Sequence, residues 1–123
     1  MTGITEIKIN GTIKSLKFGN YALYEYTKLT GADIGNIKEI GENYTQLDLA
    51  TDVIFCGLIG ACRVNKEVVD FTREDVSVWI DDVSQLDQLN AIKEFYASVV
   101  SHTHDMLEAL KAMASDGEKK SRL

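Results

Sequence analysis

The sequence has no proline, one tryptophan, two cysteines and two histidines among its 123 residues. Without proline, it contains no proline-rich linker and no polyproline recognition segment. If Cys56 and Cys62 lie on one helix, they are about 9 Å apart along its axis, which is beyond disulfide reach. We therefore expect two reduced, buried thiols, as in a cytosolic protein.

Long apolar segments and basic stretches are missing as well. The most apolar run, residues 47–62, is free of charge only from residue 53 onward, and a bilayer span needs ~20 apolar residues. Residues 1–11 have no basic-then-apolar leader, so we expect no signal peptide. The net charge of −6 gives an acidic surface that repels phosphate. Neither a membrane nor nucleic acid is an expected partner.

The acidic excess is concentrated in one segment. Residues 67–94 contain eight acidic side chains and only two basic ones, Arg73 and Lys93. Such a segment can attract a basic partner, or it can simply keep the protein soluble. Both interpretations stay open on the sequence alone.

One turn predicts the start of the fold. Asn10-Gly11, between alternating residues, indicates a β-hairpin over residues 6–18 with a two-residue loop. One face of the hairpin then carries apolar side chains, with Lys14 as the exception and Ile13 on the opposite face. The apolar residues are Ile7, Ile9, Leu16 and Phe18. An isolated hairpin is marginal in water, so this one must pack on helices.

Helices are expected through the rest of the chain. The first covers residues 21–30, with Asn20 as N-cap, Gly31 as the closing residue and an inner face of Ala22, Leu23, Tyr26 and Leu29. One or two short helical turns follow within residues 32–44. A central helix, capped by Thr45 and ending at Arg63 or Val64, is apolar on nearly every side and should be buried. Its glycines, Gly57 and Gly60, weaken a helix and indicate close approach of a neighbouring element.

Two further helices complete the prediction. Thr72 and Asp75 form a variant capping box before a helix over residues 73–82 that buries Val76, Trp79 and Ile80. The last helix, residues 84–114, would be ~45 Å long, with a stripe of Leu86, Leu89, Ile92, Tyr96, Val99, Val100, Met106, Leu107, Leu110 and Met113. The predicted fold is α+β and mostly α, a hairpin on a bundle of about four helices. Residues 1–114 form one domain, and residues 115–123 a polar, flexible tail.

The chemistry-bearing side chains form no convincing site. His104 and Glu108 share a helix face, but His102 points away from them, and two ligands do not make a zinc site. Ser101, His104 and Asp105 lie within one helical turn, without oxyanion donors. We therefore expect no catalytic residue, no metal, no cofactor and no enzymatic activity.

The long last helix supplies the main functional hypothesis. Its apolar stripe exceeds what the hairpin and three shorter helices can cover, so part of it should be free to bind another copy or an amphipathic partner helix. The predicted partner-binding residues are Tyr96, Val99, Val100, Met106, Leu107 and Leu110.

Several segments, in order, resemble the tail assembly chaperones of long-tailed bacteriophages. The similar segments are residues 7–11 (IKING), 16–19 (LKFG), 22–23 (AL), 30–31 (TG), 55–58 (FCGL), 71–76 (FTREDV) and 79–81 (WID). They cover about residues 4–85, and Lys14 stands where that family usually has an apolar residue.

The resemblance implies a non-enzymatic function. Proteins of this family bind the aggregation-prone tape measure protein in the cytoplasm of the infected bacterium, keep it soluble and promote polymerisation of the tail tube protein around it. They are absent from the mature virion. The alternative is a virion structural subunit, such as a tail completion or head–tail joining protein.

Overall fold

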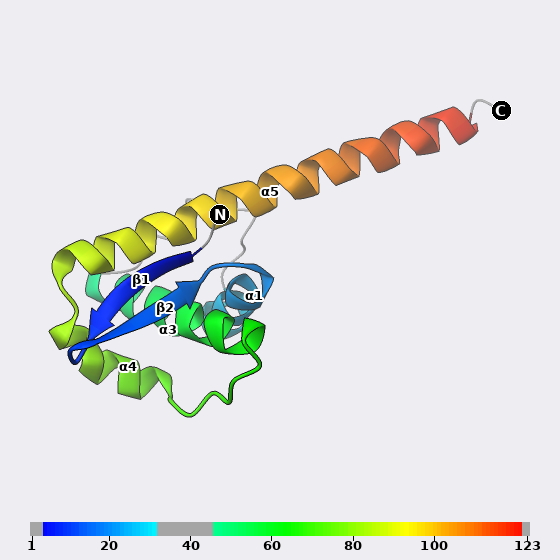
Figure 1. Ribbon diagram of the computed structural model, residues 1–123. Helices are drawn as coiled ribbons and strands as arrows, with labels where there is room; N and C mark the ends of the chain where they lie inside the picture. Colours follow the sequence, from blue (N-terminus) through cyan, green and yellow to red (C-terminus); the bar gives the residue numbers. More distant parts are fainter. Residues whose placement is uncertain (1–3, 32–45, 122–123) are drawn as a thin grey trace.

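The computed structural model describes the backbone of residues 4–31 and 46–121 and the side chains of residues 4–31 and 48–113. In chain order the elements are β1 (Ile4–Ile9), β2 (Thr12–Lys17), α1 (Asn20–Thr30), α3 (Gln46–Val64), α4 (Arg73–Trp79), a 3-10 turn η1 (Ile80–Asp82) and α5 (Gln85–Ser121). The fold is α+β and mostly helical, as predicted. The hairpin, α1, α3 and α4 form a body, and α5 crosses this body and then projects beyond it (Figure 1). The predicted turns within residues 32–44 and the Thr45 cap lie outside the described residues.

The hairpin has the predicted turn and register. Asn10 and Gly11 both have positive φ, 51° and 80°, which is the conformation that a two-residue hairpin loop requires. The strands pair antiparallel, with Ile9 opposite Thr12 and Ile7 opposite Lys14. The predicted apolar face is buried: Ile7, Ile9, Leu16 and Phe18 are each at most 5% exposed. The assignment of the hairpin's faces is therefore confirmed.

Helix α3 is the centre of the body. Its buried side chains point in nearly all directions, and they include Leu49, Ala50, Val53, Ile54, Cys56, Leu58 and Ile59. A Cβ added at Gly57 would lie 2.8 Å from the Phe18 ring, and one added at Gly60 would overlap the carbonyl oxygen of Lys17. The close approach that the glycines indicated is therefore present, and the neighbour is the end of β2.

Helix α1 departs from the prediction at its N-terminal end and in one residue of its inner face. Gly19, not Asn20, is the N-cap residue, and no side chain caps this helix end. Gly31 ends the helix as predicted, with φ 73° and its N–H donated to the Thr27 carbonyl. Leu29 is 40% exposed, which corrects its assignment to the inner face. The buried residues Ala22, Leu23 and Tyr26 centre the inner face elsewhere on the helix, so Leu29 lies at its edge.

The predicted capping box opens α4. The Asp75 N–H donates to Thr72 Oγ1 at 3.2 Å, and the Thr72 N–H donates to Asp75 Oδ2 at 2.9 Å. The shorter aspartate therefore completes the reciprocal pair. The α-helix ends at Trp79, and Ile80 to Asp82 continue as η1. Val76 and Ile80 are buried, as predicted, whereas Trp79 is only half-buried.

Helix α5 is longer than predicted, and a different arc of it faces the body. It continues to Ser121, so its 37 residues extend about 55 Å. The fully buried side chains are Ala91, Phe95 and Val99, and the Phe95 ring lies 4.6 Å from that of Tyr26. Leu86 and Leu89 are exposed, a correction to the predicted stripe. Apolar residues occupy adjacent positions along α5, so the stripe is wide and only packing selects the inner arc.

Candidate partner-binding surface

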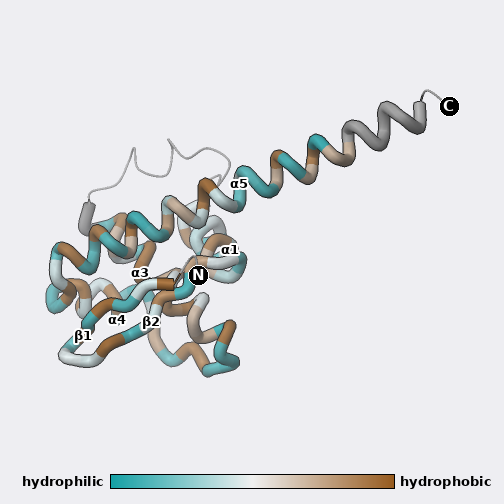
Figure 2. The backbone as a smooth tube through the Cα atoms, turned by 45° about the horizontal axis from the view of Figure 1, so that its top comes forward, coloured by the Kyte–Doolittle hydropathy of each residue, from teal (hydrophilic) through white to brown (hydrophobic). Residues whose placement is uncertain are grey.

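Helix α5 projects beyond the body of the protein, and its projecting part carries both hydrophobic and hydrophilic residues (Figures 1 and 2). Five side chains, which we call the α5 stripe, are between 44% and 68% exposed: Val100, Met106, Leu107, Leu110 and Met113. Their spacing of three, four and seven residues places them along one side of a helix. Such spacing is that of anchors for a second helix.

Two of the predicted partner-binding residues, Val99 and Tyr96, are less exposed than the α5 stripe. Val99 is fully buried, so it is a core residue and cannot contact a partner while the protein is folded. Tyr96 is half-buried, with its ring 5.8 Å from that of Phe95, and burial raises the pKa of its hydroxyl. The structure keeps Val100, Met106, Leu107 and Leu110 exposed and adds Met113.

The polar residues beside the stripe are of both signs. Glu108 and Lys111 form an exposed pair, 3.7 Å apart, one turn from each other. His104 and Asp105 are exposed, and His102 is half-buried. Within the part of the chain that the structure describes, no three His, Cys, Asp or Glu side chains come together as a set of metal ligands. His104 and Glu108 share one face of α5, and the absence of a metal site stays a prediction.

The acidic segment does not act as one surface, because some of its members have local bonds. Asp75 closes the capping box of α4, and Asp87 accepts the backbone N–H of Lys8 on β1 at 3.0 Å. Glu67 and Asp70 are exposed on the connector between α3 and α4. Part of the charge excess therefore serves the fold.

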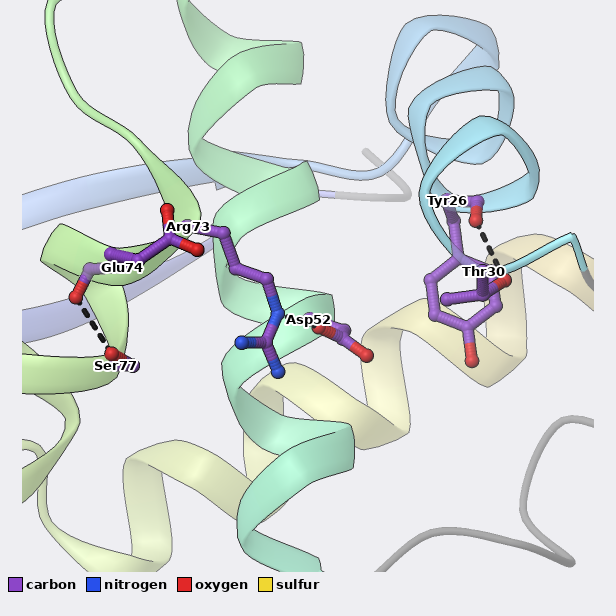
Figure 3. A network of polar contacts seen from close by, with 6 residues as sticks. All are labelled: Tyr26, Thr30, Asp52, Arg73, Glu74 and Ser77. Atoms are coloured by element: carbon purple, nitrogen blue, oxygen red, sulfur yellow. Dashed lines mark hydrogen bonds and ion pairs between the residues drawn. The ribbon is translucent and has the colours of Figure 1, made fainter.

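A partly buried ion pair between α3 and α4 was not predicted from the sequence. Asp52 on α3 is 4% exposed, and its Oδ1 accepts a hydrogen bond from Arg73 Nε at 2.5 Å (Figure 3). This bond raises the pKa of the Arg73 guanidinium. Because Arg73 is the first residue of α4, the pair joins the start of α4 to α3. The available signal was an aspartate within the apolar run of residues 47–62.

The two cysteines are not activated nucleophiles. Burial, and then the charges of Asp52 and Glu25, raise the pKa of Cys56 far above its ordinary value. Burial, and then Glu67 and Asp70, also raise the pKa of Cys62. Both thiols are free. Cys56 is buried, but Cys62, in the last turn of α3, is only half-buried, which corrects the expectation of two buried thiols. A thiolate, which is the reactive form, is therefore disfavoured at both positions.

Comparison of the chain with protein-family models, with curated proteins and with solved structures finds no match. The resemblance to tail assembly chaperones stays a prediction. Among the helices that the structure describes, none is both long enough and apolar enough to cross a membrane.

Proposed function

We propose that this protein is a non-enzymatic phage tail assembly chaperone that binds the tape measure protein through the α5 stripe. The observation that carries the proposal is the exposure of Val100, Met106, Leu107, Leu110 and Met113 on a helix that projects beyond the body. The family resemblance of residues 4–85 supplies the partner. The tail tube protein, the host cytoplasm and absence from the mature virion belong to the same proposal.

The size of the stripe favours a weak and reversible complex. Full burial of a Leu, Met or Val side chain contributes about 1.5–3 kcal/mol, and these five are already about half-buried. Covering the rest of them gives roughly 4–7 kcal/mol, which is comparable to the cost of association, about 4–15 kcal/mol. One contact is therefore weak, and several copies on one long helical partner would bind more tightly together.

A chaperone that must leave its client suits such energetics. Many weak contacts keep apolar helical faces covered, while each copy can still dissociate quickly. Methionines at 106 and 113 also suit a partner whose anchor positions vary, because the unbranched side chain adapts to irregular surfaces. A stable virion subunit would instead need a larger permanent interface.

The test is co-expression with the tape measure protein of the same phage. Leu107→Asp with Leu110→Asp introduces charge into the stripe without touching the buried arc of α5. The matched control is Leu86→Asp with Leu89→Asp, which changes two exposed leucines elsewhere on the same helix. Circular dichroism checks that both variants are folded.

We expect the stripe variant to leave the tape measure protein insoluble and the control to keep it soluble. If both variants solubilise it equally, the stripe is not the binding surface. If the wild-type protein instead forms a stable ring and is found in purified particles, the virion-subunit alternative replaces the chaperone.

A further inference from the structure

The two edges of the hairpin differ in how their backbone groups are satisfied. A two-residue turn makes Ile9 and Thr12 a hydrogen-bonded pair, so the alternation of an antiparallel ladder turns the backbone groups of the next residues, Lys8 and Ile13, outward. On β1, the outward N–H of Lys8 donates to Asp87 Oδ2 on α5. The N–H of Asp87 in turn donates to Ser84 Oγ at 3.1 Å, which holds the acid at the start of α5. The β1 edge is therefore capped at this position.

The β2 edge has no such cap. Ile13 and Ser15 direct their N–H and C=O groups away from β1 by the same alternation. Among the described residues, neither has a hydrogen-bond partner for its backbone outside the hairpin. An edge with unpaired backbone groups is a template for another strand.

A groove runs beside this edge. It has a volume of about 570 Å³ and lies between β2 and the connector that joins α3 to α4. Its walls include Leu58 and Ala61 of α3, together with Phe71 and Trp79, whose rings are 6.0 Å apart. We call it the β2 groove. It is separate from the α5 stripe, because the two share no residue.

The β2 groove also has a charge preference. Glu67 and Asp70 line it from the connector, opposite the single base Lys14 on β2. After burial, these two acids are the main cause of the raised Cys62 pKa, whereas Lys14 acts in the opposite direction. Their negative field therefore reaches the groove wall formed by α3. Val68, which is 84% exposed, adds an apolar contact at the groove's margin.

We propose that the β2 groove binds an extended segment of another protein by strand addition, with backbone bonds to Ile13 and Ser15. Alternate side chains of that segment face the apolar wall and favour Val, Ile or Leu. A Lys or Arg is favoured beside Glu67 and Asp70. The proposal goes beyond the chaperone function, because it concerns a second surface and an extended rather than a helical partner.

The probe is a fluorescein-labelled synthetic heptapeptide, Lys-Val-Thr-Val-Lys-Val-Thr, acetylated and amidated, whose binding is followed by fluorescence anisotropy. Two further peptides carry N-methyl groups at the odd or the even positions. Only one edge of an added strand faces β2, so one methylated peptide should bind about tenfold more weakly, equivalent to ~1.4 kcal/mol, and the other should bind like the parent. A peptide with Glu in place of Lys should bind more weakly than the parent.

The protein variants test the same edge. Ser15→Pro removes an outward N–H, which an edge strand tolerates, and should abolish binding. Ser15→Thr keeps the N–H and should bind normally. Hydrogen exchange of the Ile13 and Ser15 amides should slow when the parent peptide is added. If Ser15→Pro does not fold, the pair of methylated peptides and the exchange data decide the question on the wild-type protein.

Three results would overturn the proposal. They are no binding of the parent peptide, equal binding of the two methylated peptides, and a wild-type dimer that Ser15→Pro converts to monomer, which would show that a second copy uses the edge. The variant Leu107→Asp with Leu110→Asp should bind the peptide like wild type, so that failure at one surface is distinguishable from failure at the other.

Discussion

Replacing Gly60 with alanine should destabilise the protein, although alanine is the better helix former. In an exposed helix, the change would add about 1 kcal/mol of stability. Here the new Cβ would overlap the Lys17 carbonyl oxygen and lie 3.3 Å from the Ala22 side chain. A backbone oxygen cannot rotate away as a side chain can. Relief of the overlap requires the end of β2 to move away from α3.

The magnitude follows from what that movement disturbs. Leu16 and Phe18 flank Lys17 and are buried against α3. Inserting extra atoms into a packed core costs about 1–3 kcal/mol, and a backbone obstacle should place Gly60→Ala at the upper end of this range. After the gain in helix propensity, we expect a net loss of about 2 kcal/mol, or a fall in melting temperature of roughly 8 °C for a chain of this size.

Gly57→Ala is the matched comparison on the same helix. Its new Cβ would lie 2.8 Å from Phe18 ring carbons and 2.9 Å from the Leu16 Cβ. These are side-chain atoms, and the ring can shift, so the loss should be smaller than at Gly60. Urea denaturation followed by circular dichroism measures both. A Gly60→Ala protein as stable as wild type, or more stable, would refute the close packing of α3 against β2.

Four further outcomes are expected. Leu16→Ala should lower the free energy of unfolding by about 2–5 kcal/mol in urea titration, and an unchanged midpoint would contradict the hairpin's docking. Arg73→Met should cost about 3 kcal/mol, because Asp52 stays buried without this partner, whereas Arg73→Met with Asp52→Leu should recover most of the loss. Because their pKa values are raised, Cys62 should react slowly with a thiol reagent at pH 7, and Cys56 hardly at all. Both thiols should react faster as the pH rises. In urea, the two thiols should react at the same rate. Chelator should leave the melting temperature unchanged, and a clear drop would point to a bound metal.

The features that the sequence predicted best depend on residues that are close together in the chain. The hairpin follows from Asn10-Gly11, since few residues tolerate positive φ at both turn positions. The capping box follows from Thr72 and Asp75, because the two bonds close within one helical turn. Gly57 and Gly60 predicted a close neighbour without naming it. The neighbour is β2, and no local pattern specifies which distant element fills that space.

The inner arc of α5 could not be read from the sequence for a physical reason. Apolar side chains occur in adjacent pairs, such as Phe95 with Tyr96 and Val99 with Val100. Each pair offers two helix faces about 100° apart, and periodicity favours neither. The choice depends on Tyr26, whose ring packs on Phe95 from a helix about 70 residues away in the chain. The ion pair of Asp52 with Arg73 could not be predicted from the sequence for the same reason, because it depends on the packing of α4 beside α3.

The paired arrangement on α5 lets one helix serve stability and binding at once. Val99 is fully buried and Val100 is 53% exposed, so consecutive residues belong to the core and to the α5 stripe. A partner helix on the stripe would extend the apolar contact of α5 without displacing any core side chain. Binding would then require no rearrangement of the body. Its free-energy cost would consist only of the cost of association and the cost of ordering the exposed side chains.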